Sequence, residues 1–255
     1  MRLSIITVTY NAERYLERTL QSINRQTRRD AIEHLIIDGR SQDRTLAIIE
    51  GYRESIDYIS SEPDQGLYDA MNKGIQHASG DFVWFVNAGD ELYDHTAAAR
   101  VLQALETGAD IAYGETMLVD EAGQALGLRS QLTPHLLPAQ LTWRTLQRGL
   151  AVSHQSFIVR RSMAPLYEHQ RHFYSADVDW MIKCLKASRH TALAQGILTR
   201  FLLGGFSQKN HAKSLLDRFA VLRRHFGLGL TLWNHARIVG RAALFRLGGS
   251  RSNRL

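Results

Sequence analysis

Residues 61–92 read SEPDQGLYDAMNKGIQHASGDFVWFVNAGDEL and hold, in order, a polar loop, a helix, a strand and a polar turn. Apolar side chains at helical spacing predict the helix over Tyr68–Ala78. The apolar run that follows predicts a buried strand over Phe82–Val86. Asn87 and Asp90 come directly after this strand. Alternation of helices with short apolar strands is typical of a parallel sheet flanked by helices.

The same alternation covers the first 113 residues. The predicted strands are Leu3–Thr9, His34–Asp38, Tyr58–Ser61, Phe82–Val86 and Asp110–Tyr113. The predicted helices are Glu13–Arg25, Asp43–Glu54, Tyr68–Ala78 and Thr96–Leu105. Polar residues follow four of these strands. Ligands of open parallel sheets bind outside the carboxyl ends of the strands, so we expect a binding site at that edge.

Residues 114–129 predict a hairpin that turns at Glu121–Gly123. The elements expected after it are a loop with short helices at 133–149, a strand at 151–159, a helix at Asp177–Lys186 and a strand at 191–203. No shift in composition separates residues 114–206 from residues 1–113, so both belong to one α/β domain.

Charge separates a body from a tail. The chain carries a formal net charge of +6. Residues 207–255 hold ten Lys/Arg and one acid, Asp217, which gives this segment +9 and leaves residues 1–206 at −3. An apolar stripe at helical spacing predicts a helix within the tail, formed by Leu215, Leu216, Phe219, Leu222 and Phe226. A second basic stretch with an apolar face covers Leu230–Leu247.

The composition excludes several classes of protein. With 255 residues, 44% apolar residues and no internal repeat, the chain is neither disordered nor a solenoid. Its single cysteine, Cys184, forms no internal disulfide, which favours the reducing cytoplasm. The N-terminal run is short and broken by threonines, as expected of a first strand rather than a signal peptide. No stretch reaches the roughly 18 to 20 apolar residues that span a bilayer.

The motifs at the strand ends suggest that phosphate is bound through a divalent cation rather than by a glycine-rich loop. Neither GxGxxG nor GxxxxGK[ST] is present, which argues against dinucleotide-binding dehydrogenases and P-loop enzymes. A carboxylate at a strand end can instead hold Mg²⁺ or Mn²⁺, which shares phosphate oxygens with the protein. Asp90 fits that role by position, although an Asp after a strand also serves to cap a helix or form a turn.

Six stretches together resemble the family 2 glycosyltransferases, in particular the bacterial exopolysaccharide type that includes colanic-acid enzymes. The stretches are SIITVTYNAERYLERTLQSI (4–23), IDGRSQDRT (37–45), the segment 61–92, SHQSFIVRR (153–161), SADVDWMIK (175–183) and GGFS (204–207). The resemblance implies a GT-A fold, a mixed and mostly parallel sheet flanked by helices. It assigns residues 1–113 to the half that binds the nucleotide sugar and 114–206 to the acceptor half, and the charge pattern leaves 207–255 as a basic helical extension.

The resemblance also implies roles for residues on the donor side. Thr7, Tyr10 and Asn11 match the end of the first strand, which lines the nucleoside. Asp38 matches the acid that accepts a hydrogen bond from the base. The residues that match the stretch past the ribose and the phosphates are Asp64, Gly66 and Lys73.

Asp90 matches the last acid of the family's metal motif. Where many members carry Asp-x-Asp-Asp, this chain has Asn-Ala-Gly-Asp at 87–90, with a single carboxylate. Asn87 is therefore included in the expected donor site. A single carboxylate can hold Mg²⁺ or Mn²⁺ when phosphates and waters supply the other ligands.

On the acceptor side, Asp177 matches the family's general base at the start of a helix. Asp179 lies two positions further and faces elsewhere on the helix, as a neighbour of the acceptor. Either acid could instead stabilise the helix N-terminus. His154 and Gln155 are expected to face the sugar or the diphosphate, and Trp180 is a candidate for stacking on a sugar.

These features predict an inverting, metal-dependent glycosyltransferase of the cytoplasm that uses a UDP- or GDP-sugar and a glycan or lipid-linked glycan acceptor. Its product would belong to bacterial exopolysaccharide, capsule or O-antigen. The alternatives are a non-catalytic subunit that binds nucleotide sugars and, with less support, a sugar nucleotidyltransferase. Residues 207–255 could lie on the inner membrane surface, pack on the body or form an oligomer contact. No nucleic-acid motif is present.

Overall fold

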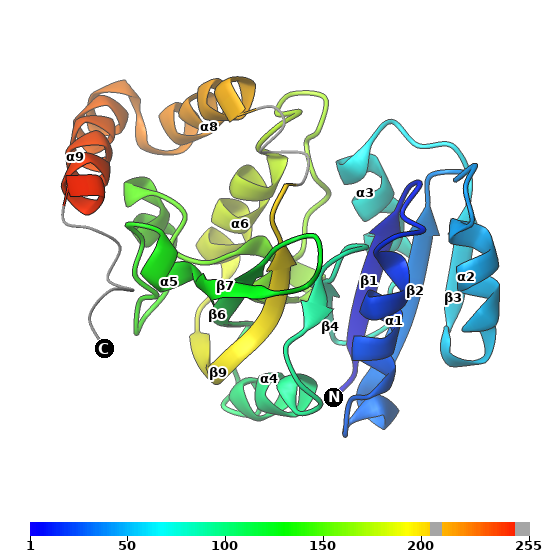
Figure 1. Cartoon of the computed structure of the whole chain (residues 1–255). Coiled ribbons are helices and arrows are strands. Elements are labelled where there is room, and N and C mark those ends of the chain that lie inside the picture. The colour runs from blue at the N-terminus through cyan, green and yellow to red at the C-terminus, as the bar shows by residue number, and fades with distance from the viewer. Residues whose placement is uncertain (205–210, 248–255) are drawn as a thin grey trace.

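The structure, a computed structural model, describes residues 1–204 and 211–247 (Figure 1). Within these residues, nine strands form one sheet with the order β3-β2-β1-β4-β8-β6-β9-β5, and β7 pairs with β6 beside this path. The strands are β1 (Leu3–Thr9), β2 (Ile32–Asp38), β3 (Tyr58–Ser61), β4 (Phe82–Phe85), β5 (Glu91–Leu92), β6 (Ile111–Val119), β7 (Ala125–Leu128), β8 (Phe157–Arg160) and β9 (Thr191–Leu202). The helices are α1 (Leu16–Asn24), α2 (Thr45–Gly51), α3 (Leu67–His77), α4 (Ala97–Leu105), α5 (Arg129–Leu132), α6 (Ala176–Ala187), α8 (His211–Phe226) and α9 (Leu228–Leu247).

The sheet is mixed and mostly parallel, as predicted. Strand β1 pairs in parallel with β2 and β4, and β2 pairs in parallel with β3. A crossover helix joins each of these consecutive strands, because parallel neighbours need a long connection. Strand β8 runs antiparallel to both β4 and β6 and joins the two halves of the sheet. Strands β6 and β9 are parallel again.

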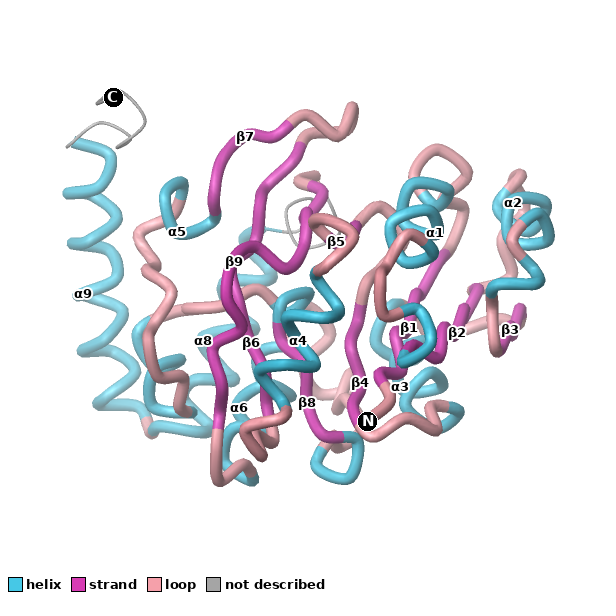
Figure 2. The backbone as a smooth tube through the Cα atoms, turned by 90° about the horizontal axis from the view of Figure 1, so that it is seen from below, coloured by secondary structure: helices cyan, strands magenta, loops and turns pink. Residues whose placement is uncertain are grey.

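Helices cover both faces of the sheet, which explains why every residue of β1 and β2 is buried. Ile36 of β2 packs with α1 and α2 on one face. Ile6 and Ile37 pack with α3 on the other face, in a core that continues to α6. Figure 2 shows α1 and α2 on the opposite side of the strands from α3. This arrangement leaves the carboxyl ends of the parallel strands open at one edge.

The C-terminal helices pack on the body at α6 and at the short turn Trp143–Arg148. Val221 and Leu222 of α8 are buried, and Trp143 stacks on Phe226 with 5.4 Å between the ring centroids. Leu216, by contrast, is 74% exposed and lies outside the packed face. The tail therefore combines a packed face with exposed apolar side chains. In the described ranges, 1–204 and 211–247, the structure contains no helix with the length and apolar character of a membrane span.

Two local departures from the predicted elements affect the site. The strand expected over 151–159 begins only at Phe157, because His154–Ser156 form a short 3-10 turn. Helix α5 follows the predicted hairpin without a helical signal in the sequence. Both segments contribute side chains to the pocket described next.

Candidate active site

A cavity of about 390 Å³ lies at the carboxyl ends of β4 and β9. Its wall comes from α3, the turn after β4, α5, residues 150–155, α6, the end of β9 and α8. The polar side chains that the argument below uses are those of Asn87, Asp90, Arg129, His154, Asp177 and Arg218. Four predicted acids and amides, Asn87, Asp90, Gln155 and Asp177, thus share one cavity with two arginines.

A tight turn after β4 places Asp90 in the wall. Gly89 has a φ of +103°, and a Cβ there would lie 2.8 Å from the Leu202 side chain, so the turn requires glycine. The Asp90 carboxylate is buried and accepts a hydrogen bond from the Leu202 N–H at 3.1 Å. Burial raises the pKa of Asp90 to about 7, although this bond and the Gln155 side chain act to lower it.

Asn87 lies in the same wall, and its Oδ1 is buried without a hydrogen-bond partner among the described residues. Carboxylate and amide oxygens are ligands that Mg²⁺ and Mn²⁺ prefer. An unpartnered oxygen and a carboxylate of raised pKa in the lining of one cavity fit a cation, since a cation would satisfy both. The part of the chain that the structure describes holds no group of three or more His, Cys, Asp or Glu arranged for a metal. Most ligands of such a cation would therefore come from the substrate and water.

Asp177 stands in the first turn of α6, on the wall formed by that helix. The Tyr68 hydroxyl donates a hydrogen bond to its Oδ1 at 3.1 Å. Burial, and then the negative charge of Asp177, raise the pKa of Tyr68 well above its ordinary value, so the tyrosine remains a donor. Asp177 itself is half-buried at the cavity. A carboxylate held at a pocket in this way has the geometry of a general base.

His154 and Gln155 support the site from the 3-10 turn. The His154 Nε2 lies 2.7 Å from the Tyr167 hydroxyl, and the Tyr167 ring stacks on Tyr68. Burial lowers the pKa of His154 to about 4, so the imidazole is neutral near pH 7. The Gln155 carbonyl accepts a hydrogen bond from Trp84 Nε1 at 2.7 Å. Both residues line the cavity: His154 is linked to Asp177 through Tyr167 and Tyr68, and the Gln155 side chain hydrogen-bonds with Asp90.

The nucleoside-side residues gather at the ends of β1, β2 and β3. Asp38 is buried and accepts hydrogen bonds from the Ser41 N–H at 2.9 Å and the Ser61 hydroxyl at 2.7 Å. Gly39 leaves room for Asp64, because a Cβ on residue 39 would lie 2.5 Å from the Asp64 Oδ2. The structure therefore brings Asp64 against the loop that follows Asp38.

Tyr10 and Asn11 complete this group. Tyr10 is 63% exposed, and Asn11 adopts a left-handed φ of +46°. The Asn11 Oδ1 accepts a hydrogen bond from the Gln42 N–H at 2.8 Å. Gly66, with a φ of +108°, begins α3 and donates its N–H to Asp64 Oδ1 at 2.8 Å.

Lys73 braces the same loop. Its ammonium lies 2.8 Å from the Pro63 carbonyl and 2.9 Å from a Glu62 carboxylate oxygen. The lysine thus fixes the segment that runs into α3.

The structure places three of the predicted site residues outside the lining of the cavity. Thr7 is fully buried in β1 and lies 3.1 Å from His34 Nε2. Trp180 is fully buried and donates to the Pro165 carbonyl, which leaves its ring no open face for the predicted stacking on a sugar. Asp179 points toward α8, where it contacts His225 at 2.7 Å.

The environment of Asp179 explains its orientation. Burial alone would raise the pKa of Asp179, but hydrogen bonds from His225 and Lys183 outweigh burial and lower the pKa to about 2. Asp179 is therefore an ionised tether between α6 and α8.

Arg129 and Arg218 were not predicted as site residues. The pocket unites them from α5 and α8, which lie far apart in the sequence. One signal existed for Arg218: it precedes Phe219 and lies one helical turn before Val221 and Leu222, the residues that pack on the body.

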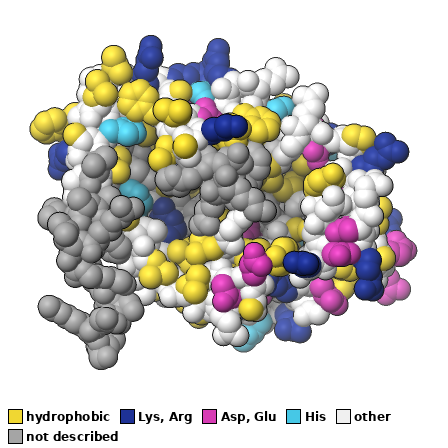
Figure 3. Space-filling model, turned by 45° about the horizontal axis from the view of Figure 1, so that its top comes forward, with side chains coloured by type: hydrophobic (Ala, Val, Ile, Leu, Met, Phe, Trp, Pro, Cys, Tyr) yellow, Lys and Arg dark blue, Asp and Glu magenta, His cyan; other side chains and the backbone are white. Residues whose placement is uncertain are grey.

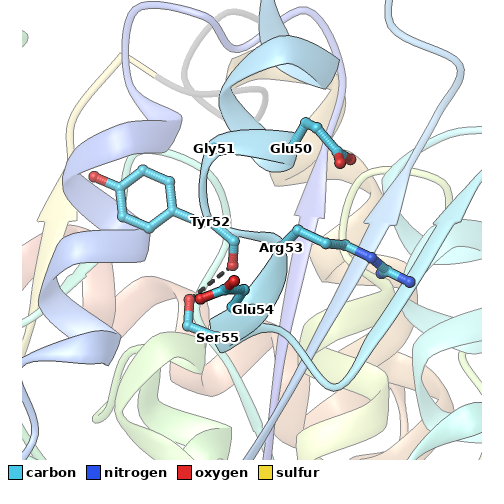
Figure 4. Close-up of a pocket in the computed structure, with 6 residues that line it drawn as sticks. All are labelled: Glu50, Gly51, Tyr52, Arg53, Glu54 and Ser55. Atoms are coloured by element: carbon cyan, nitrogen blue, oxygen red, sulfur yellow. Dashed lines mark hydrogen bonds between the residues drawn. The ribbon is translucent and has the colours of Figure 1, made fainter.

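A second hollow contains none of these site residues. It is lined only by the consecutive residues 50–55 at the end of α2, where the Ser55 hydroxyl donates to the Tyr52 carbonyl (Figure 4). It is lined by one short continuous segment, the end of α2 and the 3-10 turn that follows, so we regard it as a surface feature of that segment.

The mixed, mostly parallel sheet flanked by helices is the GT-A glycosyltransferase fold, as the solved structures below show. The model of the family Glycosyl transferase family 2 matches residues 4–165, and the chain belongs to this family. Solved structures with the same fold include TarS of S. aureus in complex with UDP-GlcNAc, at a TM-score of 0.69 and 18% identity over 99% of this chain and 74% of that chain. Mannosyltransferase PcManGT from Pyrobaculum calidifontis, in complex with GDP-Man and Mn²⁺, has a TM-score of 0.60 and 16% identity over 98% of this chain and 76% of that chain.

Relatives by sequence match a shorter part. An uncharacterized glycosyltransferase of Mycobacterium tuberculosis is 43% identical over 102 residues, 40% of this chain and 39% of the relative. A PGL/p-HBAD biosynthesis glycosyltransferase of the same species is 37% identical over 120 residues, 45% of this chain and 46% of the relative. The Campylobacter jejuni GalNAc(5)-diNAcBac-PP-undecaprenol beta-1,3-glucosyltransferase is 28% identical over 124 residues, 47% of this chain and 40% of the relative. The match thus spans less than half the length of each of these relatives.

Proposed function

We propose that this chain is an inverting glycosyltransferase that transfers a sugar from a UDP- or GDP-sugar to a hydroxyl of a glycan or lipid-linked glycan. One observation carries the proposal: Asp90 and Asp177 line the same cavity at the carboxyl ends of the strands. The complexes of TarS with UDP-GlcNAc and of PcManGT with GDP-Man support the donor class, because both proteins share this fold.

Asp177 acts as the general base. It removes the proton of the acceptor hydroxyl while the oxygen attacks the anomeric carbon, and the bond from that carbon to the diphosphate oxygen breaks on the opposite side. The configuration inverts because attack and departure occur on opposite faces. Tyr68 holds one oxygen of Asp177, which keeps the other oriented for the acceptor.

Asp90 and Asn87 are the residues that would hold Mg²⁺ or Mn²⁺. When bound, the cation neutralises charge on the departing diphosphate. Tyr10, Asn11, Asp38, Asp64 and Gly66 form the nucleoside side of the donor site, with Lys73 fixing its loop. His154 and Gln155 keep the two acidic groups in place.

The acceptor is proposed to be lipid-linked, and the product to belong to exopolysaccharide, capsule or O-antigen. The name of the Campylobacter jejuni relative includes an undecaprenol diphosphate, which supports a lipid carrier. The +9 charge of residues 207–255 would suit a peripheral position on the anionic inner face of the plasma membrane, with the enzyme in the cytoplasm.

The test is Asp177→Asn, which keeps the size of the side chain and removes the base. We expect turnover of the donor to fall by about 10² to 10⁴ while donor affinity changes less than about twofold. Asp30→Asn is the control, because Asp30 forms only an exposed ion pair with Arg28. Calorimetry measures donor binding, and release of nucleoside diphosphate measures turnover.

Unchanged turnover of Asp177→Asn would refute the assignment of the base. If the unmodified chain binds a nucleotide sugar but neither hydrolyses it nor uses any acceptor in a panel, the non-catalytic subunit is the correct alternative. Formation of a nucleotide sugar from a nucleoside triphosphate would instead identify a nucleotidyltransferase.

A further inference from the structure

Two arginine side chains face the cavity without a carboxylate partner. Arg129 extends from α5 and Arg218 from α8, and both line the pocket with Asp90 and Asp177. Within residues 1–204 and 211–247, neither guanidinium lies within 4.0 Å of a carboxylate oxygen. The two acids of the pocket therefore leave both cations without a direct ion pair.

Several other arginines of the described residues do form ion pairs. Arg160 pairs with Asp110 at 3.0 Å, and Arg100 pairs with Asp94 at 2.9 Å. Arg224, which like Arg218 belongs to α8, pairs with Glu168 at 2.8 Å. Exposed arginines such as Arg223 also have no ion pair among the described residues, so what sets Arg129 and Arg218 apart is their place in the cavity wall with Asp90 and Asp177.

The hydrogen bonds of the two guanidinium groups are also incomplete. Arg129 donates one bond to the Leu150 carbonyl. The Nε of Arg218 is buried and has no partner among the described residues. A buried donor without an acceptor costs free energy, which an acceptor brought by a ligand would recover.

The two cations also influence each other. Burial lowers the pKa of Arg129 to about 10, the charge of Glu115 raises it and the charge of Arg218 lowers it further. Glu115 does not come within ion-pair distance of Arg129. Two like charges at one half-enclosed cavity repel each other, and an anion between them would offset both desolvation and repulsion.

The anion that fits best carries several oxygens at one end of a larger ligand. Guanidinium groups bind phosphate oxygens in paired, charge-assisted hydrogen bonds, and a diphosphate offers oxygens to two such groups at once. Asp90 provides a single carboxylate for the proposed cation. That one cation leaves part of the negative charge of a diphosphate without a counterion. Arg129 and Arg218 supply two positive charges on the walls formed by α5 and α8.

We propose that Arg129 and Arg218 bind the diphosphate of the donor, so that helix α8 of the C-terminal extension is part of the donor site. This inference rests on the proposed function and names residues that hold the leaving group. The diphosphate gains negative charge as its bond to the sugar breaks, and fixed guanidinium groups stabilise that charge without reorganisation.

The experiment compares the affinities of three ligands that differ only in phosphate: UDP, UMP and uridine, with GDP, GMP and guanosine in parallel, all at one Mn²⁺ concentration. The variants are Arg218→Gln, Arg129→Gln and Arg218→Lys. Arg223→Gln is the matched control, since Arg223 is exposed on the same helix. Calorimetry in the absence of lipid gives the dissociation constant of each ligand for each variant.

We expect each Gln variant to weaken the nucleoside diphosphate about ten- to a hundredfold, as loss of a charged hydrogen bond predicts. The nucleoside alone should change less than about twofold, and Arg223→Gln should match the unmodified chain. Arg218→Lys should recover part of the lost affinity, because it restores the charge without the planar guanidinium.

Two outcomes would overturn the inference. One is an unchanged affinity for UDP and GDP in both Gln variants. The other is an equal loss for diphosphate, monophosphate and nucleoside, which would mean that the arginines support the fold. If the unmodified chain binds no nucleotide of either series, the proposed function fails, which is distinct from both results.

Discussion

The charge state of a buried side chain follows from its surroundings, and His34 illustrates this at the centre of the sheet. His34 lies in β2 with only 1% of its surface exposed. Its Nε2 contacts the Thr7 hydroxyl at 3.1 Å, and its Nδ1 has no partner among the described residues. Burial, and then the positive charge of Arg29, lower the pKa of His34 to about 3. The folded protein therefore holds a neutral imidazole near pH 7.

This neutral histidine predicts a loss of stability in acid. Below the unfolded pKa of 6.5, the unfolded chain binds a proton at His34 that the folded chain does not bind, so the free energy of unfolding falls as the pH falls from 6.5 toward 3. At pH 5 the loss from His34 amounts to about 2 kcal/mol. Urea unfolding at pH 7 and pH 5 measures it.

The comparison variant is His34→Gln, which keeps a polar group near Thr7 and cannot take up the proton. Between pH 7 and pH 5 the unmodified chain should lose about 2 kcal/mol more than the variant. Because only the change between the two pH values is compared, the cost of the substitution itself cancels. An equal loss in both proteins would contradict the neutral state of His34.

Helix α8 holds the start of helix α6, the element that carries Asp177. The Asp217 carboxylate accepts hydrogen bonds from the N–H groups of Tyr174 and Ser175 at 2.8 and 2.9 Å, and lies 2.9 Å from His172 Nδ1. At the C-terminal end of α8, His225 contacts Asp179. The C-terminal extension thus holds α6, and with it the proposed general base Asp177, through contacts at the middle and at the C-terminal end of α8.

Asp217→Asn tests this positioning role. The amide has one acceptor oxygen instead of two charged ones, so we expect the free energy of unfolding to fall by about 1.5 to 3 kcal/mol. Turnover should fall with little change in donor affinity, because Asp217 contacts α6 rather than the ligand. Hydrogen exchange at Tyr174 and Ser175 should accelerate. Asp30→Asn again serves as the control.

A purely stabilising role for Asp217 would give a different pattern. Turnover per folded molecule would then equal that of the unmodified chain, and only the unfolding midpoint would change. Normal exchange protection at residues 174 and 175 would likewise exclude the proposed contact.

Strands and helices with local signals were predictable. The bounds of β1 and β3 match the prediction, because apolar runs and polar turns define both. Strand β5 has two residues and no such run, and it exists through pairing with β9. The shortened β8 has the same origin, since residues 154–156 leave the strand to brace Tyr167 and Asp90. Tertiary contacts decide these elements, and a local pattern does not contain them.

Side chains of the site were predictable where they follow strands or begin helices. Asp90 and Asp177 occupy one cavity as expected. The structure places Thr7 and Trp180 in the core, because helices cover both faces of β1 and because α6 is deeply buried at residue 180. Arg129 and Arg218 could not be paired from sequence, since their proximity depends on how α5 and α8 pack.

At the scale of the molecule, the tail packs on the body with one face and exposes apolar side chains on another. Leu216 of α8 and Trp233 of α9 are 74% and 63% exposed. Figure 3 shows hydrophobic side chains beside Lys and Arg side chains along the edge where these helices lie. Apolar side chains among basic ones suit the surface of an anionic bilayer. Deleting the tail would not test membrane binding, because Asp217 and His225, which hold α6, would be lost with it.

Point substitutions separate membrane binding from the fold. In the variant Leu216→Ser with Trp233→Ser, both exposed side chains become polar, and stability should change by less than about 1 kcal/mol. Each buried apolar side chain contributes about 1.5 to 3 kcal/mol to insertion, so sedimentation with phosphatidylglycerol vesicles should weaken at least about tenfold. Leu46→Ser, at a 40% exposed residue of α2, is the control and should bind as the unmodified chain does. Phosphatidylcholine vesicles and raised salt should both reduce binding of the unmodified chain, since attraction between basic residues and anionic lipid weakens in both conditions. Equal sedimentation of the double variant and the unmodified chain would contradict membrane binding through α8 and α9. The exposed apolar surface of these helices would then be assigned to an oligomer contact.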